Sequence, residues 1–442
     1  MKIAINVGNP IYHAANGIVK IGLTTGAGDK SEIIIDFESL LPFAASVPKE
    51  VLDFFFLSAT VYGIDRFILR RQNSVDGWSR ELKVKIPVYE LPKWISAKLD
   101  VEALLSFLTG DYWEVDFTKS EFNLPSFQLD TQSNRFFSQV NLFSGGLDSL
   151  IGAIDILESN PKEHILFVSH YDSQMHGPKG DQQYLIREIG YKYSDKFEHI
   201  PSIRVSLDDS TLLKETTFRS RSILFMGIAL VTANAKGIPI SVPENGTVSL
   251  NFPLSSSRRS ACSTRTTHPT MMAFTRALWN TLGIKTTVKN PYEFFTKGDM
   301  VANCKNKMLL QEIVEYSNSC GKRGHRSHWT DNKEATHCGV CMPCVYRRAS
   351  LQSIKDNTSY GTNLNSLSPF KTQKGQDIGA CLQYLNNPLT QNEAKQELLI
   401  NGMKDLSQTD KYADLVLRSR KELKDWLRLF GNSDIKRRAG IV

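Results

Sequence analysis

The sequence has no apolar run long enough to cross a bilayer. Its longest apolar stretch, residues 223–231, falls well short of the roughly 20 residues that a transmembrane helix needs. The first residues, MKIAINV, alternate as a strand does and lack the apolar centre and cleavage site of a signal peptide. There is no internal repeat and no low-complexity tract. These absences predict a folded, cytoplasmic protein without a membrane segment.

Cysteine is scarce, and neither sign of charge dominates. The seven cysteines are an odd number, and a chain of 442 residues is too long to need disulfides for stability; clustered thiols in a reducing compartment bind metal more often than they pair. The formal net charge is +7, from basic residues that are spread along the chain. This balance suits an anionic ligand such as ATP, and an ordinary solvated surface equally well; alone it does not predict nucleic-acid binding.

Three regions differ in their hydrophobic pattern. Residues 1–125 predict an N-terminal α+β accessory domain, with an Asn16-Gly17 hairpin turn, a helix over 48–62 and a half-buried strand over 82–88. Residues 355–442 predict a helical C-terminal region. In it Leu423, Trp426, Leu427 and Phe430 form a stripe that should dock on the main body.

The middle region, residues 126–354, alternates short apolar runs with helix-length segments. Strands are expected at 140–143, 165–170, 203–207, 238–242 and 284–288, and helices near 147–158, 181–197, 219–236 and 269–282. This rhythm predicts an α/β fold with a doubly wound, mostly parallel sheet. Such sheets bind ligands beyond the carboxyl ends of their strands, here after Phe143, His170, Leu207 and Val242.

A glycine-rich loop follows the first of these strands. It reads SGGLDS: Ser144, Gly145, Gly146, Leu147, Asp148 and Ser149. Adjacent glycines let the backbone turn sharply and bring N–H groups close to an anion, and the start of the next helix adds further N–H groups. Asp148 would repel phosphate unless Mg²⁺ lay between them, so we interpret it as a metal-binding or orienting residue.

The Walker pattern is absent, because no lysine follows the glycines. The loop instead resembles the PP-loop of the ATP pyrophosphatase superfamily, in which ATP adenylates a substrate oxygen and releases pyrophosphate. A tight turn without function is the alternative interpretation.

Three cysteines recur at intervals of three, and a fourth lies upstream. Cys320, Cys338, Cys341 and Cys344 could close a tetrahedral, structural zinc site. His325, His328 or His337 could replace one thiolate, and a redox pair or an iron–sulfur cluster are alternatives. Cys262, Cys304 and Cys381 have no such partners and are interpreted as core residues.

Together, the loop and the cysteine cluster before Arg347-Arg348 resemble the 7-cyano-7-deazaguanine synthase (QueC-like) family. The segments Gln174-Met175-His176, 218–225 and 296–300 are similar to further motifs of that family, and the likeness covers residues 138–354. It implies activation of a 7-deazaguanine-type carboxylate with ATP, followed by attack of an amine. The implied cofactors are ATP, Mg²⁺ and Zn²⁺.

The family likeness and the sheet geometry together give the candidate site residues. Catalytic roles fall to Asp148, Ser149, Arg221 and Lys297, and nucleotide contacts to the loop with His170, Gln174 and His176. Substrate contacts are expected from Glu244, Arg265 and His268, although a helix cap or a surface charge would equally explain Lys297 and Glu244.

The chain departs from the family pattern in three places. The cysteines are split by an insertion, the segment between 244 and 269 is longer, and both terminal regions are additional. This layout is similar to QueC-like proteins of anti-phage defence operons such as the Qat system. It implies a changed acceptor, such as an amine on a partner protein of the same operon. A PP-loop enzyme that modifies tRNA by thiolation or lysidine formation, and a non-catalytic scaffold, remain alternatives.

Overall fold

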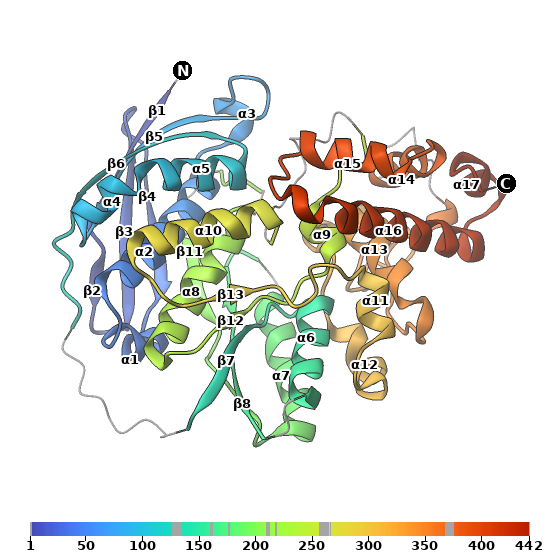
Figure 1. Ribbon diagram of the computed structural model, residues 1–442, viewed down its shortest axis with the longest axis horizontal. Helices are drawn as coiled ribbons and strands as arrows, with labels where there is room; N and C mark the ends of the chain where they lie inside the picture. The colour runs from blue at the N-terminus through green and yellow to red at the C-terminus, as the bar shows by residue number, and fades with distance from the viewer. Residues whose placement is uncertain are drawn as a thin grey trace.

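The computed structural model describes residues 2–125, 135–159, 162–175, 177–208, 213–216, 219–255, 265, 267–366 and 375–441. Two sheets and a group of C-terminal helices make up the molecule (Figure 1). No helix in these ranges is long and apolar enough to span a membrane.

An eight-stranded mixed sheet contains all strands of the N-terminal region. Its order is β6-β5-β1-β3-β4-β11-β9, with β2 added on β3. The strands are β1 (Ile3–Val7), β2 (Ile11–His13), β3 (Ile18–Thr25), β4 (Lys30–Asp36), β5 (Glu81–Val88), β6 (Tyr112–Lys119), β9 (His170–Tyr171) and β11 (Ile203–Leu207). The predicted hairpin lies between β2 and β3, where Gly17 has φ +64°. The predicted strand over 82–88 is β5.

One helix of the N-terminal region is buried on all sides. The helices of this region are α1 (Leu41–Ala44), α2 (Lys49–Phe67), α3 (Arg70–Asn73), α4 (Leu91–Ser96) and α5 (Lys98–Thr109). Helix α2 contains the predicted helix 48–62 and is buried from Val51 to Phe67. It packs closely on α8 (Arg221–Lys236), where a Cβ at Gly227 would collide with Ser58. The two sheets thereby share one continuous core.

The second sheet is parallel throughout and has the order β10-β8-β7-β12-β13. Its strands are β7 (Phe137–Leu142), β8 (His164–Val168), β10 (Phe197–His199), β12 (Ile240–Ser241) and β13 (Val288–Lys289). Along the chain, β8 and β10 are added on one side of β7, and β12 and β13 on the other. The order therefore reverses between β7 and β12, which is where doubly wound sheets form their ligand crevice.

Helices cover both faces of this parallel sheet, as the sequence predicts. On β8, Ile165 and Phe167 join one core with α6 (Leu147–Ser159) and α7 (Pro178–Tyr193). Leu166 and Val168, which point the opposite way, join the core of α8 and α10 (Pro269–Leu282).

Residues 203–207 are not in the parallel sheet, and that expectation is wrong. They form β11, which pairs antiparallel with β4 and parallel with β9, so the middle region supplies two strands to the N-terminal sheet. The edge of the parallel sheet is instead β10, at the end of the segment expected to be helical to residue 197. The domain limits at 125/126 and 354/355 remain predictions.

The C-terminal part is helical. The last helices of the middle region are α9 (Gly246–Leu250), α11 (Lys297–Ala302), α12 (Lys307–Ile313) and α13 (Met342–Ser350). They are followed by α14 (Gln376–Asn386), α15 (Gln391–Ile400), α16 (Thr409–Phe430) and α17 (Ser433–Arg438). Short 3-10 turns cover Glu38–Leu40, Val314–Tyr316, Arg323–His328, Leu351–Ser353, Leu364–Ser366 and Leu406–Gln408. Leu423, Trp426 and Leu427 are buried against α13 and α14 as expected. Phe430 is 51% exposed, because α16 ends there at Gly431, and it does not belong to the docked stripe.

Candidate functional site

The glycine loop connects the end of β7 to the first turn of α6. Gly145 has φ +79°, a left-handed conformation that disfavours a side chain. The hydroxyl of Ser144 donates to Ser149 Oγ at 3.2 Å and accepts the N–H of Gly146 at 3.3 Å. Ser149 Oγ donates to the carbonyl of Gly146 at 3.0 Å. Both hydroxyls therefore lie inside the turn, beside the N–H groups that begin α6.

An ion pair joins this loop to a second strand exit. Asp148 lies in the first turn of α6, and its Oδ1 is 2.6 Å from Nζ of Lys297. Lys297 is the first residue of α11, which a capping box between Thr296 and Asp299 starts just beyond β13. The Lys297 and Asp148 side chains are only 8% and 14% exposed. The pair carries no net charge, but it holds an ammonium group directly beside the loop, in a place shielded from water.

A second residue that binds the Asp148 carboxylate, Asn245, lies just after β12. Asn245 Nδ2 donates to Asp148 Oδ2 at 2.6 Å, and its Oδ1 caps α9 by accepting the N–H of Val248 at 2.9 Å. The carboxylate of Asp148 is thus held from both sides, by Lys297 and by Asn245. A metal ion at Asp148 would take over one of these contacts.

Glu244, next to Asn245, is an unusual acid. Burial raises its pKa to about 7, and the nearby charge of Asp148 acts in the same direction; the Thr267 hydroxyl, which donates to it, and Lys297 act against this. Its backbone is fixed by Asn290, whose amide donates to the carbonyl of Glu244 at 2.7 Å. Glu244 is therefore poised between its charged and neutral forms near neutral pH.

These groups surround a cavity of about 330 Å³, which we call the loop cavity. The residues lining it are Ser144, Gly146, Leu147, Asp148, Ser149, Pro243, Glu244, Thr247, Val248, Asn251, Phe252, Lys297, Asn318, Ser319, Met342, Pro343 and Tyr346. It lies where the strand order reverses, with helix N-termini, hydroxyls and a lysine at one end. This donor set suits an anion such as a phosphate chain.

The four predicted cysteines are brought together. The sulfur atoms of Cys320, Cys338, Cys341 and Cys344 all lie within 4.8 Å of one another. Backbone N–H groups point at two of them: those of Lys322 and Cys338 at Cys320 Sγ (both 3.3 Å), and that of Cys341 at Cys338 Sγ (3.3 Å). Such N–H groups stabilise thiolates, so the cluster is compatible with a zinc ion.

The alternative with a histidine ligand finds no support in the geometry. His337 Nε2 accepts the N–H of Ser319 at 3.2 Å, and its Nδ1 lies 2.8 Å from the hydroxyl of Thr336. Both ring nitrogens are engaged. Burial, reinforced by Arg347, lowers the pKa of His337 to about 2, so the ring is neutral. His325 and His328 lie on an exposed 3-10 turn.

The cysteine segment also supports the glycine loop. The N–H of Asn318 donates to the carbonyl of Gly145 at 2.8 Å, and Asn318 Oδ1 accepts the N–H of Cys320 at 2.9 Å. Gly146 lies so close to Asn318 that an added Cβ would be 3.3 Å from its carbonyl oxygen. The loop therefore packs against the residues that directly precede Cys320.

His170 and Gln174, expected beside the nucleotide, and Arg221, expected to be catalytic, are not among the described residues that line the loop cavity. The ring of His170 is buried against Tyr62 and Phe225, and burial lowers its pKa to about 3. Gln174 accepts a hydrogen bond from Arg66 and donates to the carbonyls of Leu207 and Asp208 at the end of β11. Arg221 stacks on Phe225, 5.3 Å from the ring centre. His176 lies outside the described residues.

Two of the three expected substrate residues contact the N-terminal region. The guanidinium of Arg265 lies 4.2 Å from the ring centre of Phe107 and donates to its carbonyl at 2.9 Å. His268 begins α10, where its Nδ1 accepts the N–H of Thr270, and its ring also packs on Phe107. The neighbouring Thr267, which binds Glu244, is the member of this segment that reaches the site.

Three residues that organise the site were not predicted from the sequence. Gln182 donates to the carbonyls of Ser144 (3.1 Å) and His170 (3.0 Å), and so ties the loop to the exit of β8. Asn245 and Asn318 were also missed. Asn245 follows a predicted strand and opens a short helix, a signal that could have identified it as a cap; Gln182 and Asn318 have no such local signal.

None of the family models, curated proteins or solved structures compared with the chain matches it.

Proposed function

We propose that this chain is a PP-loop ATP-dependent ligase of the QueC-like type, in which residues 144–149 bind the β- and γ-phosphates of ATP while a carboxylate attacks the α-phosphate. The observation that carries the proposal is the pair Asp148–Lys297, held by Asn245 at the reversal of strand order and directly beside the Ser144–Ser149 turn.

Adenylation solves a chemical problem that this site is suited to. A carboxylate resists attack by an amine until one of its oxygens is a good leaving group, and transfer of AMP to that oxygen supplies one. Pyrophosphate leaves in the first step and AMP in the second, when the amine nitrogen forms the amide bond. Catalysis then consists of stabilising charge on the departing pyrophosphate and of holding the two reactants in place.

Each group has a role in this scheme. The N–H groups at the start of α6 and the hydroxyls of Ser144 and Ser149 would bind the pyrophosphate oxygens. Lys297 would offset the charge that develops as the pyrophosphate leaves. Asp148 is the carboxylate that would hold Mg²⁺, which neutralises phosphate charge when bound.

The part of the loop cavity beside Glu244 favours a nitrogen heterocycle as the substrate. Glu244 lines it and can accept hydrogen bonds from the N–H edge of a 7-deazaguanine-type base when ionised. Phe252, Met342 and Tyr346 add apolar surface for a flat ring. Arg265 and His268 stay candidates only if the segment moves away from Phe107.

The alternatives receive less support. Sulfur transfer in tRNA thiolation needs a reactive thiol, but burial raises the pKa of Cys304 to about 12; Cys262 lies outside the described residues. A scaffold without activity would use the Asp148–Lys297 pair only to hold the start of α6 against the start of α11. The longer segment between 244 and 269 and the additional terminal regions are the basis on which we extend the proposal to anti-phage defence, with ammonia or an amine of a partner protein as the acceptor.

Pyrophosphate exchange tests the first step alone. Labelled pyrophosphate should enter ATP when the purified protein, Mg²⁺ and 7-carboxy-7-deazaguanine are present, and should not when the base is omitted. Formation of ADP in place of AMP would contradict the proposal, because it would mean attack at the γ-phosphate.

A further inference from the structure

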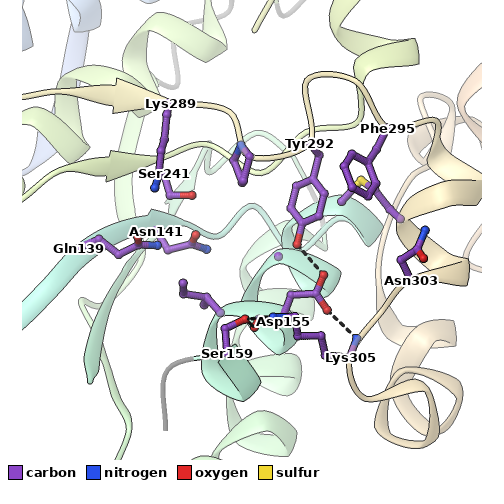
Figure 2. Close-up of a pocket in the computed structure, with 14 residues that line it drawn as sticks. Gln139, Asn141, Asp155, Ser159, Ser241, Lys289, Tyr292, Phe295, Asn303 and Lys305 are labelled. Carbon is purple, nitrogen blue, oxygen red and sulfur yellow. Dashed lines mark hydrogen bonds between the residues drawn. The ribbon is translucent and has the colours of Figure 1, made fainter. Parts of the chain in front are cut away.

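A second, larger cavity of about 430 Å³ lies on the α6 side of the parallel sheet, and we call it the sheet-face pocket. Figure 2 shows Gln139, Asn141, Ser241 and Lys289 on its strand side, with Tyr292, Asp155 and Lys305 across from them. The remaining lining residues are Gly152, Ile156, Ser159, Pro291, Phe295, Met300 and Asn303.

The strand side of this pocket is a polar row across three neighbouring strands. Ser241 of β12 pairs in register with Asn141 of β7 and with Lys289 of β13, and Gln139 precedes Asn141 by two residues on the same face. On β8 the next position of the same row is Phe167, which belongs to the apolar core under α6 and α7. The row is therefore apolar under the helices and becomes polar where the pocket opens.

Polar side chains in the centre of a parallel sheet need a partner, because such sheets are normally buried on both faces. Asn141, Ser241 and Gln139 are 1%, 3% and 8% exposed. Within the described part of the chain, the Gln139 amide and the Ser241 hydroxyl have no hydrogen bond, and the only one of the Asn141 side chain runs to the carbonyl of Leu142 at 3.4 Å. All three side chains face the pocket.

On the opposite wall the polar groups form hydrogen bonds with one another, and the charged side chains around the pocket have a positive net charge. The hydroxyl of Tyr292 donates to Asp155 Oδ2 at 2.7 Å, and the N–H of Lys305 donates to Oδ1 at 2.8 Å (Figure 2). The Lys305 ammonium donates to Ser159. Lys289 is exposed and forms no ion pair with a described residue. One acid faces two lysines, so an anionic group is favoured at the rim.

The sheet-face pocket is separate from the loop cavity. Gly152 lines the former and Pro243 lines the latter, and the two residues are packed together so closely that a Cβ at Gly152 would collide with the proline ring. A ligand in one cavity therefore does not occupy the other.

We propose that the sheet-face pocket is a second binding site, for a planar nitrogen heterocycle that carries an anionic group, as a nucleoside monophosphate does. The amides of Gln139 and Asn141 each offer a donor and an acceptor, which matches the alternating edge of a base. Tyr292 and Phe295 supply aromatic surface beside the row. Lys289 and Lys305 bind the phosphate at the rim. The proposal stands whether or not the loop cavity binds ATP.

Isothermal titration of the full-length, metal-loaded protein with guanosine 5′-monophosphate tests this assignment. A non-hydrolysable ATP analogue is present in one series and omitted from the other, so that binding at the loop cavity is scored separately. The expected result is one GMP site that persists with the analogue bound. Its affinity falls at least tenfold in Asn141→Leu and in Lys289→Ala, and is unchanged in Lys285→Ala, a matched exposed lysine outside the pocket.

Two further ligands distinguish binding of the base from binding of the phosphate. Guanosine should bind at least tenfold more weakly than GMP, and should be insensitive to Lys289→Ala. Inorganic phosphate that competes as well as GMP would overturn the assignment of a heterocycle. Absence of GMP binding, or binding that neither variant weakens, would overturn the proposal. Because Lys289 is exposed, its variant is decisive even if Asn141→Leu fails to fold.

Discussion

The N–H of Asn318 donates to the carbonyl oxygen of Gly145 at 2.8 Å, and this bond joins the cysteine segment to the glycine loop. The Asn318 side chain continues the connection, since its Oδ1 accepts the N–H of Cys320. A metal ion on the four cysteines would therefore stabilise the same backbone that shapes the loop. The cysteine cluster and the loop cavity are parts of one structural unit.

Loss of the metal should weaken nucleotide binding, although none of the four clustered cysteines is among the described residues that line the loop cavity. We expect one zinc ion per chain by elemental analysis, and its loss together with at least tenfold weaker binding of an ATP analogue in Cys341→Ser. Cys381→Ala, a buried cysteine outside the cluster, should keep both. Full analogue binding by a zinc-free protein would contradict the coupling.

Asn318→Ala tests the hydrogen bond between the Asn318 side chain and the N–H of Cys320. It removes the acceptor for the Cys320 N–H but keeps all four thiols, so the zinc content should not change. One neutral hydrogen bond contributes roughly 0.5–1.5 kcal/mol, and we expect the KM for ATP to rise about threefold to tenfold at nearly constant kcat. A variant that loses zinc as well would show that Asn318 supports the metal site and not the loop.

Lys297 should act mainly on the chemical step. Lys297→Met keeps the length of the side chain and removes the charge beside the departing pyrophosphate, so kcat for AMP formation should fall about 10²–10³-fold. Lys285→Met provides the control, because Lys285 is exposed and outside both cavities. An unchanged kcat in Lys297→Met would remove Lys297 from the mechanism.

Glu244 should give the proposed recognition of the base a pH dependence. Its pKa is raised to about 7 by burial, so the ionised form, which accepts N–H groups, becomes populated as the pH rises through 7. The KM for the heterocycle should fall over that range. Glu244→Gln should raise this KM about tenfold and abolish its pH dependence, while the KM for ATP stays constant. Equal effects on both substrates would indicate a structural role.

Glu422 of α16 should make stability pH-dependent. It accepts the hydroxyl of Thr296 and the N–H of Gly298 at the start of α11, and burial raises its pKa from 4.5 to about 7. Between pH 4.5 and pH 7, Glu422 therefore keeps its proton in the folded protein, whereas it has lost this proton in the unfolded chain. The stabilisation is complete below pH 4.5 and is lost as the pH rises through 7, by an amount on the order of 3 kcal/mol.

Urea unfolding at pH 5 and pH 8 measures this difference. In Glu422→Gln the decrease in the free energy of unfolding between the two pH values should be smaller by that amount, whereas Glu312→Gln, at an exposed position, should match the unsubstituted protein. The same decrease in all three proteins would assign the pH dependence to other groups.

Local patterns predicted the elements well, but not all of their pairings. The turn at Gly145, the helix that follows it and the cysteine spacing are each set by neighbouring residues, so the sequence alone indicates them. The destination of residues 203–207 depends on β4, some 170 positions earlier in the chain, and no periodicity encodes that choice. A five-residue apolar strand fits either sheet.

Single residues of the candidate site could likewise be predicted from the sequence, but their contacts with distant residues could not. Asp148 follows from the loop motif and Lys297 from a family likeness, but their 2.6 Å contact spans 149 positions. Gln182 lies on an ordinary helical segment and acts through two distant carbonyls. His170 was placed near the nucleotide because it ends a strand; its side chain instead faces the core shared by α2 and α8, which only the packing of the two sheets reveals.

The most direct test of the proposed activity is mass spectrometry of the full reaction. The purified protein is incubated with ATP, Mg²⁺ and 7-carboxy-7-deazaguanine, with and without ammonium, beside an Asp148→Ala variant. We predict AMP, pyrophosphate and an amide or nitrile of the base in the ammonium reaction, and none of them with the variant. Absence of AMP from every reaction, also after candidate partner proteins are added, would contradict the proposal and favour a scaffold.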